Sequence, residues 1–425
     1  MGVNLLSMLM ALFFSNACDN IEPVKAGNDS VTRVIDSTKL VLPSGFKSTV
    51  FYENLGRARH IAVAPNGDVY VKLEKLKDGN GIYRITDANK DGIADNATGF
   101  GNYIGTGMAI KNGYLYASSD DGVFRYKMDN GVAATNAPET IVKNLWNRRQ
   151  HSAKAITLDD AGNIYVNIGA PSNVCQVEDR KNASPGISPC PILDSAGGIW
   201  QFKVDQKDQS YAQGLRYATG LRNVVGLDWN VLANDLYAMQ HGRDMLFQSY
   251  PALFNQQEGA ENPAEEMFRL KKGADAGWPY CYYDNGKNQK LMNPEYGGDR
   301  KSAGVCPGKT QSIAQFPGHL APNALLFYTG TMFPEKYRNG AFIAFHGSWN
   351  RSPEPQEGYY VVFVPFKNGM PDGKWEIFAD GFAGPGKAQG KADHRPTGLA
   401  QGPDGALYVS DDQKGTIWKI TYSGQ

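Results

Sequence analysis

Apolar and polar residues alternate along most of this chain in short runs of strand length, and the runs come in pairs. The clearest pair is Ile61–Val71, in which two apolar runs flank the turn residues Asn66-Gly67. Alternation with a period of two is typical of a strand with one buried face, and Asn-Gly between two such runs is a strong hairpin signal. The pattern therefore predicts a β-hairpin over residues 61–71.

This hairpin is an internal repeat. Five further copies follow: Met108–Ala117, Ala155–Val166, Val225–Ala238, Ala324–Phe345 and Leu399–Val409. Several copies continue into another strand that begins with Gly and carries aromatic residues: Gly81–Ile85, Gly122–Tyr126, Gly198–Phe202 and Gly415–Ile420. Units of about four strands in six copies predict an all-β fold, a six-bladed β-propeller of four-stranded antiparallel blades.

Such a ring has to close, because a single sheet cannot bury both of its faces. We expect an N-terminal strand, Ser48–Tyr52, to complete the last blade beside Thr416–Tyr422. A pair of packed sheets is the alternative fold, but it leaves the repeated Gly-initiated strand unexplained. The repeats are longer than common propeller units, and the excess falls in two predicted insertions, Pro171–Ser195 and Tyr250–Pro317.

The N-terminus has a different pattern. Leu5–Phe14 is apolar except for Ser7 and has no preceding Lys or Arg, and Ser15-Asn16-Ala17-Cys18 follows it. An apolar run before small residues is typical of a secretory signal peptide, and a small residue directly before Cys resembles a bacterial lipoprotein box. We expect residues 1–17 to be a signal peptide, Cys18 to carry a lipid anchor, residues 18–39 to form a tether and residues 40–425 to form the propeller. The protein would then lie in the periplasm or the outer cell envelope.

Composition agrees with export and argues against a nucleic-acid partner. Lys plus Arg and Asp plus Glu each number 43, so the chain lacks a basic excess. No apolar run is long enough to predict a membrane-spanning helix. Four cysteines remain besides Cys18, and none has the Cys-x-x-Cys spacing of a zinc ribbon or a c-type haem. Neighbouring cysteines enclose loops with little core of their own, which favours the disulfides Cys175–Cys190 and Cys281–Cys306.

The densest polar chemistry lies between two apolar runs, in His346-Gly347-Ser348-Trp349-Asn350-Arg351. A loop that only reverses the chain needs Gly, Asn, Asp or Pro, so this composition indicates a binding surface on a rigid scaffold. An ordered turn over a buried Trp is the alternative. Asp87–Asp95 alternates oxygen side chains around a Gly, a pattern that suits either a calcium loop or a polar hairpin tip.

Histidines and arginines recur near the ends of the predicted inner strands, where they can meet at one mouth of the central channel. The histidines are His60, His151, His241, His346 and His394, and the arginines are Arg59, Arg222, Arg243, Arg351 and Arg395. Guanidinium groups bind carboxylates in bidentate fashion, so this mouth suits an anionic ligand. Pairing with nearby carboxylates, such as Asp228, Asp244, Asp393 and Asp411, is the alternative.

Over about residues 40–422 the chain resembles the glucose/sorbosone dehydrogenase family, the soluble quinoprotein sugar dehydrogenases. The motifs that carry the resemblance are His346–Arg351, Gly277–Cys281, Gly220–Asn223 and Arg395–Asp412. It is most similar to the sorbosone or pyranose dehydrogenase branch. The resemblance implies a six-bladed propeller that holds pyrroloquinoline quinone (PQQ) and calcium at the channel mouth. It also implies oxidation of an aldose or sugar aldehyde at C1 to a lactone or acid, with an external electron acceptor.

The resemblance further implies roles for single residues. His151 matches the general base, and Arg222 and Asn223 match the pair that holds the PQQ oxygens, which places Arg222 in the catalytic set as well. Gln240 adjoins the cofactor, and the backbone carbonyls of His241 and Gly242 match the calcium ligands.

The remaining cofactor contacts lie towards the C-terminus. Arg395 matches an arginine that pairs with a PQQ carboxylate, and His346 or Arg351 stands where relatives have a Lys.

The chain also departs from the family pattern. The Asp that orients the base is replaced by Ala170, for which Asn167 or Asn173 could substitute, and a second C-terminal Arg falls at Asp393. Two other functions therefore stay open. One is a calcium-dependent lactonase on a similar propeller, and the other is a non-catalytic binding propeller of the cell envelope.

Overall fold

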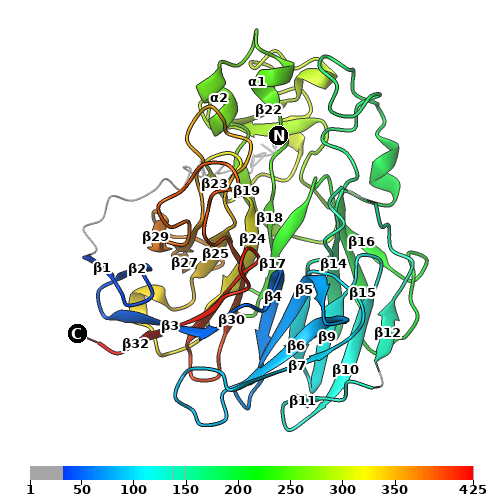
Figure 1. The fold of residues 1–425 in the computed structure, drawn as a ribbon. Coiled ribbons are helices and arrows are strands. Elements are labelled where there is room, and N and C mark those ends of the chain that lie inside the picture. The colour runs from blue at the N-terminus through cyan, green and yellow to red at the C-terminus, as the bar shows by residue number, and fades with distance from the viewer. Residues whose placement is uncertain (1–31, 137, 149, 425) are drawn as a thin grey trace, which may run out of the picture.

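The computed structural model describes residues 32–136, 138–148 and 150–424. Six sheets of four or five strands form a ring of blades (Figure 1). The fold is the predicted six-bladed propeller. The predicted signal peptide, residues 1–17, and the predicted lipid anchor at Cys18 lie outside the described residues. In the part of the chain that is described, no helix is long and apolar enough to cross a membrane.

Blades 1 to 3 follow the chain from the inner strand outwards. Blade 1 contains β4 (Ala58–Val63), β5 (Val69–Lys77), β6 (Asn80–Thr86) and β7 (Asn96–Phe100). Blade 2 contains β8 (Met108–Lys111), β9 (Tyr114–Ser118), β10 (Val123–Asp129), β11 (Val132–Ala133) and β12 (Glu139–Val142). Blade 3 contains β13 (Ile156–Leu158), β14 (Asn163–Ile168), β15 (Gly198–Lys203), β16 (Leu215–Thr219) and β20 (Ala274–Asp275).

Blades 4 to 6 have four strands each. Blade 4 contains β17 (Val224–Asn230), β18 (Asp235–Gln240), β19 (Glu265–Leu270) and β23 (Ala314–Phe316). Blade 5 contains β24 (Pro322–Phe327), β25 (Ala341–Phe345), β26 (Tyr360–Val364) and β29 (Glu376–Ala379). Blade 6 contains β30 (Pro396–Gln401), β31 (Leu407–Asp411), β32 (Ile417–Tyr422) and β3 (Phe46–Tyr52).

The remaining elements are short. Three hairpins are β1 (Arg33–Ile35) with β2 (Val41–Pro43), β21 (Cys281–Asp284) with β22 (Gln289–Met292), and β27 (Phe366–Lys367) with β28 (Met370–Pro371). The α-helices are α1 (Leu246–Ser249) and α2 (Gln256–Glu261), and single 3-10 turns cover Pro191–Asp194, Pro294–Tyr296, Cys306–Gly308 and Glu335–Tyr337. Since β1 lies within residues 18–39, part of the predicted tether belongs to the folded domain.

The ring closes as predicted. β3 pairs antiparallel with β32, with Val50 opposite Trp418, so strands from both ends of the domain share one sheet. In Figure 1 the blue β3 lies beside the red β32. The inner strands β4, β8, β13, β17, β24 and β30 contact one another in this order, and β30 contacts β4 again.

Neighbouring blades bury each other's faces. One apolar cluster combines Phe51 and Tyr408 of blade 6 with Ile61 and Val71 of blade 1. In the middle of a blade both faces are covered, and β25 and β26 are buried at every residue. This explains why these strands read as continuous apolar runs rather than alternating ones. The strands form a rigid scaffold, and the loops at their ends are free to carry polar chemistry.

The two predicted insertions have different outcomes. Pro171–Ser195 is a loop closed by the predicted disulfide Cys175–Cys190. Tyr250–Pro317 contains β19 and β23 of blade 4, so only the segment between these strands and the segment around α2 are insertions. The predicted disulfide Cys281–Cys306 closes the segment with the β21–β22 hairpin. This hairpin and both α-helices lie together at the top of Figure 1, at one end of the ring.

Candidate active site

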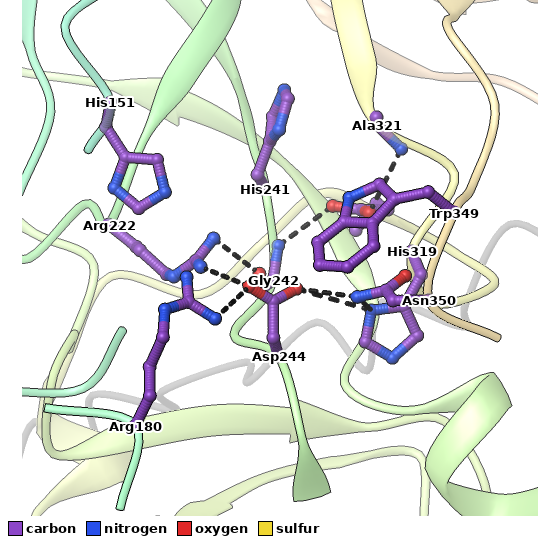
Figure 2. A pocket seen from close by; sticks show the side chains of 11 residues that line it. His151, Arg180, Arg222, His241, Gly242, Asp244, His319, Ala321, Trp349 and Asn350 are labelled. Carbon is purple, nitrogen blue, oxygen red and sulfur yellow. Dashed lines mark hydrogen bonds and ion pairs between the residues drawn. The ribbon is translucent and has the colours of Figure 1, made fainter. Parts of the chain in front are cut away.

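Loops at this end of the blades enclose a pocket of about 230 Å³ (Figure 2). Its lining residues come from six loops and the start of β19: His151, Arg180, Arg222, His241, Gly242, Asp244, Glu265, His319, Ala321, Trp349 and Asn350. Among the predicted site residues, the structure brings His151, Arg222, His241 and Gly242 together here. The two imidazoles and the guanidinium group at one pocket are the geometry expected of a polar active site.

The backbone of Ala170 orients the His151 side chain. His151 Nδ1 lies 2.6 Å from the Ala170 carbonyl oxygen. A carbonyl can only accept, so Nδ1 carries the proton and donates it, and Nε2 keeps a free lone pair. Neither Asn167 nor Asn173 orients the base. The backbone at Gly169 packs closely against His151: a Cβ added at Gly169 would lie 2.6 Å from the Cβ of His151.

Arg222 is fixed beside this base by several acceptors. Its guanidinium donates to Gly242 O at 2.9 Å, to Asn173 Oδ1 at 3.1 Å and to Asp244 Oδ2 at 2.8 Å. Its backbone carbonyl accepts from the Ala170 N–H at 2.8 Å, so the residue that orients His151 also contacts Arg222. Arg222 is 4 % exposed. A charge buried this deeply depends on its partners, which here also fix its position.

Asp244 joins the walls of the pocket. Its Oδ2 accepts from Arg222 and, at 3.0 Å, from Arg180 Nη1, while Oδ1 accepts from Asn350 Nδ2 at 2.8 Å. Figure 2 shows these contacts meeting at one carboxylate. Burial raises the pKa of Asp244, but Arg222, His319 and Arg180 outweigh burial and hold the pKa well below its usual value. Asp244 is therefore an anion that balances two guanidinium groups.

Glu265 is the second carboxyl group of the pocket. It is 2 % exposed and accepts from the Gly242 N–H at 2.9 Å and the Ala321 N–H at 3.2 Å. Burial raises its pKa to about 7 despite these hydrogen bonds. A perturbed carboxyl group in a pocket is a feature that functional sites share.

Asn223 and Gln240, predicted as cofactor contacts, lie directly behind the pocket. Asn223 Oδ1 accepts from Asn167 Nδ2 at 3.3 Å. Gln240 Oε1 accepts from the Arg222 N–H at 2.9 Å, and its Nε2 donates to Glu266 Oε2 at 3.2 Å. Both ends of the Gln240 amide are therefore engaged, and its observed role is to hold the backbone of Arg222.

His346 and Arg395 belong to a neighbouring cationic cluster, together with Arg59. His346 Nε2 lies 2.8 Å from Asp412 Oδ1, and Arg59 Nη1 lies 3.0 Å from Asp412 Oδ2. Arg395 Nε donates to the His346 carbonyl at 3.1 Å. His241 lines the pocket, and burial, Arg222 and, from this cluster, His346 and Arg59 lower its pKa to about 3. Of the five histidines predicted to meet at one mouth, His60, His151, His241 and His346 lie near one another, whereas His394 pairs with Asp411 and does not line the pocket.

The cationic cluster fits a polyanionic cofactor. Arg59 and His346 contact one carboxylate, that of Asp412, while the guanidinium of Arg395 donates to the backbone carbonyls of His346 and Gly347. Within the described residues the buried Arg59 Nε has no hydrogen-bond partner. PQQ carries carboxylate groups, which would balance the excess positive charge and accept from such a donor.

The predicted calcium ligands fit their ion less well than the cationic cluster fits PQQ. Gly242 O accepts a hydrogen bond from Arg222, so a calcium ion bound to this oxygen would lie beside a guanidinium group of the same charge. No group of three or more His, Cys, Asp or Glu side chains in the described ranges is placed to hold a metal ion, and this includes the Asp87–Asp95 loop. In that loop, Asp87 and Asp95 accept from backbone N–H groups of the loop itself. No step proposed below depends on calcium.

Arg351, also predicted as a cofactor contact, does not line the pocket. Its guanidinium donates to Ala260 O, to Gly318 O at 2.9 Å and to Pro355 O at 3.0 Å, and it pairs with Glu261. These acceptors take up the donors of the guanidinium group. We therefore assign Arg351 to the support of the His346–Arg351 loop instead of to a cofactor.

The sequence suggests Asp244 only as a partner for the arginines, and it is one for Arg222 and Arg180. Five further lining residues have no role predicted from the sequence: Arg180, Glu265, His319, Trp349 and Asn350. Trp349 and Asn350 belong to the His346–Arg351 loop, whose unusual composition already indicated a binding surface. Asp244 follows the Gln240–Gly242 segment closely. Arg180 and Glu265 lie in the two segments read as insertions, which carried no readable pattern.

The imidazoles at this mouth should stay neutral at physiological pH. Burial, with Arg222 next, lowers the pKa of His151 to about 3, and burial lowers that of His60 to about 4. In ¹³Cε1-labelled protein, we expect the His60, His151 and His241 signals not to shift between pH 8 and pH 5. The unfolded chain takes up these protons near pH 6.5, so the three groups should destabilise the fold as the pH falls below that value. The His151 signal is assigned by its loss in His151→Gln. A titration midpoint near pH 6.5 for this signal would contradict the buried position of the imidazole.

The chain is similar in sequence to other proteins over most of its length. An uncharacterized protein from Borreliella burgdorferi is 27 % identical over 415 residues, which cover 91 % of this chain and 92 % of the relative. A PQQ-dependent pyranose dehydrogenase from Coprinopsis cinerea is 24 % identical over 348 residues; the match covers 72 % of this chain and 44 % of that protein's length. The chain thus spans less than half of that relative.

Solved structures share the fold. The holo form of the PQQ domain of a Coprinopsis cinerea pyranose dehydrogenase has a TM-score of 0.71 at 22 % identity, covering 90 % of this chain and 97 % of that one. A calcium structure of a Trichoderma reesei family AA12 protein has a TM-score of 0.71 at 20 % identity, covering 94 % and 100 %. The predicted resemblance to the glucose/sorbosone dehydrogenase propellers is confirmed. Residues 40–423 match the TrAA12-like family, and the chain belongs to it.

Proposed function

We propose that this protein is a PQQ-dependent dehydrogenase that oxidises an aldose or sugar aldehyde at C1. The observation that carries the proposal is His151, whose Nε2 is a free acceptor beside Arg222 in a pocket next to a cationic cluster. The C. cinerea relative is a PQQ-dependent pyranose dehydrogenase, which supports the choice of cofactor. The residues that would hold PQQ here are Arg222, which lines the pocket, and Arg59, His346 and Arg395 of the cationic cluster.

Oxidation of a cyclic sugar to its lactone removes a proton from the C1 hydroxyl oxygen and a hydride from C1. PQQ, when bound, supplies the two-electron acceptor that the side chains lack. The sugar hydroxyl would donate to His151 Nε2 and pass its proton to that nitrogen. The Ala170 carbonyl keeps the Nδ1–H in place during this transfer. Asp244 balances the charge of Arg222, which otherwise opposes protonation of the imidazole.

Reconstitution tests this function. Purified protein is titrated with PQQ, and binding is followed by the cofactor's absorbance. Dye reduction is then measured with D-glucose, D-galactose, D-mannose and their aldehyde analogues. We expect saturable PQQ binding and sugar-dependent dye reduction that requires PQQ.

Calcium is varied in parallel, with an EDTA-treated sample as the reference. Because Arg222 engages Gly242 O, we expect PQQ binding to persist without calcium. Lactone hydrolysis without PQQ binding would reject the dehydrogenase in favour of a lactonase. Absence of both activities, together with absence of PQQ binding, would favour a binding propeller.

A further inference from the structure

Trp349 is unusual among the tryptophans because 54 % of its surface is exposed at the edge of the pocket. A single exposed apolar side chain is common on protein surfaces, but this one lines a polar pocket, where a bound ligand can cover it. Its neighbour Ser348 is 2 % exposed and Arg351 is 6 % exposed, so the loop around it is well packed. The exposure of the indole is thus a local feature and does not reflect a loose loop.

Contacts on both sides fix the position of the indole. Ser348 N–H donates to Glu357 O at 2.8 Å, and its hydroxyl donates to Gln356 Oε1 at 2.8 Å. On the other side Asn350 Nδ2 donates to Asp244 Oδ1 at 2.8 Å, and Arg351 holds the end of the loop. The indole is therefore presented by an anchored backbone. A pre-positioned aromatic ring loses little conformational freedom when a ligand binds.

The opposite wall of the pocket is polar. Figure 2 shows His151 and Arg222 on one side and the Trp349 ring on the other, with Asp244 below them. A ligand in this space meets an aromatic face on one side and hydrogen-bonding groups on the other. Molecules with one C–H-rich face and polar edges match such a pair of walls.

A pyranose ring has this form, since its axial C–H groups make a weakly polar face and its hydroxyl groups point outwards. In the proposed function Arg222 holds the planar cofactor from the wall opposite Trp349, and the other groups that would hold the cofactor lie outside this pocket. None of Arg59, His346 and Arg395 lines this pocket. The aromatic wall thus faces the space left for the substrate.

We propose that Trp349 is the stacking platform for the pyranose ring of the substrate and holds its C1 hydroxyl towards His151. The inference rests on the proposed function and goes beyond it by naming the ring form of the sugar as the bound species and one residue as its main apolar contact. It also gives the polar loop His346–Arg351 a role in substrate binding through Trp349.

The test compares Trp349→Ala with Trp349→Phe in PQQ-loaded protein. Loss of the ring should raise KM for the best of D-glucose, D-galactose and D-mannose about ten-fold, with kcat changed less than about two-fold. Phe retains an aromatic face and should restore most of the affinity. Leu232→Ala is the matched control: Leu232 is 67 % exposed but lies in the β17–β18 turn, at the other end of β18 from His241. It should leave KM unchanged.

A second readout separates this inference from the proposed function. The indole ¹H–¹⁵N signal of Trp349, assigned by its loss in Trp349→Phe, should shift when the sugar is added. A shift without any dye reduction supports the platform and rejects the dehydrogenase. Dye reduction with an unchanged KM in Trp349→Ala overturns the platform and leaves the dehydrogenase standing. A weaker PQQ affinity with an unchanged KM also overturns it, because the ring would then contact the cofactor.

Discussion

Replacing His151 by Ala should lower kcat for sugar oxidation by about 10²–10⁴-fold, the usual contribution of a positioned general base. The Ala170 carbonyl is the hydrogen-bond partner of this imidazole in the described structure, so the fold should tolerate the change. PQQ affinity should change little, because the cationic groups that would hold the cofactor are untouched. Stopped-flow reduction of bound PQQ by the sugar measures the affected step directly.

His394→Ala is the control for a lost imidazole. His394 Nδ1 lies 2.9 Å from Asp411 Oδ2 and does not line the pocket, so this variant should keep its kcat. If His151→Ala retained kcat within about ten-fold of the unmodified protein, another pocket group would be the base. Glu265, with its pKa raised to about 7, would then be the first alternative.

Asp244→Ala should lower the free energy of unfolding by about 3–5 kcal/mol, because it leaves the buried guanidinium of Arg222 without its counterion. Arg180 and the Asn350 amide lose the same partner. Asp244→Asn keeps the volume and one acceptor and should cost less. Urea unfolding followed by tryptophan fluorescence gives the difference in free energy.

An exposed ion pair provides the matched control for this loss. Lys143 and Asp208 lie 3.0 Å apart with their side chains 47 % and 62 % exposed. Asp208→Asn, which suits the left-handed backbone at this position (φ 57°), should cost less than about 1 kcal/mol, because water screens the pair. A similar small cost for Asp244→Ala would show that solvent reaches Arg222 and that the pocket is not the fixed arrangement described above.

Repetition made the fold predictable. Six hairpins with a period-two pattern specify blades, and a blade without neighbours has an unburied face, so the ring and its closing strand follow from sequence. The pattern failed in blade 4, where the β21–β22 hairpin and its disulfide separate β19 from β23. A strand so far from its hairpin has no repeat spacing to identify it.

Residues of the site could be predicted only where they belong to a recognisable sequence motif. His151, Arg222 and His241 follow from the family resemblance. The predicted cofactor role of Arg351 came from its place in the family pattern, which does not say which side chains of the loop turn inwards. Trp349 and Asn350 line the pocket, while Arg351 binds backbone carbonyls. Arg180 meets Asp244 only through the path of a disulfide-closed loop, which residue types do not specify.

The Ala170 carbonyl has a consequence for how such sites change over time. A carboxylate that orients a histidine can be lost by a single base change, whereas a main-chain oxygen is present whatever residue occupies the position. The orientation of His151 is therefore insensitive to the identity of residue 170 and sensitive to the course of the chain around Gly169. Insertions or deletions near this turn, more than substitutions within it, would be the changes that inactivate the base.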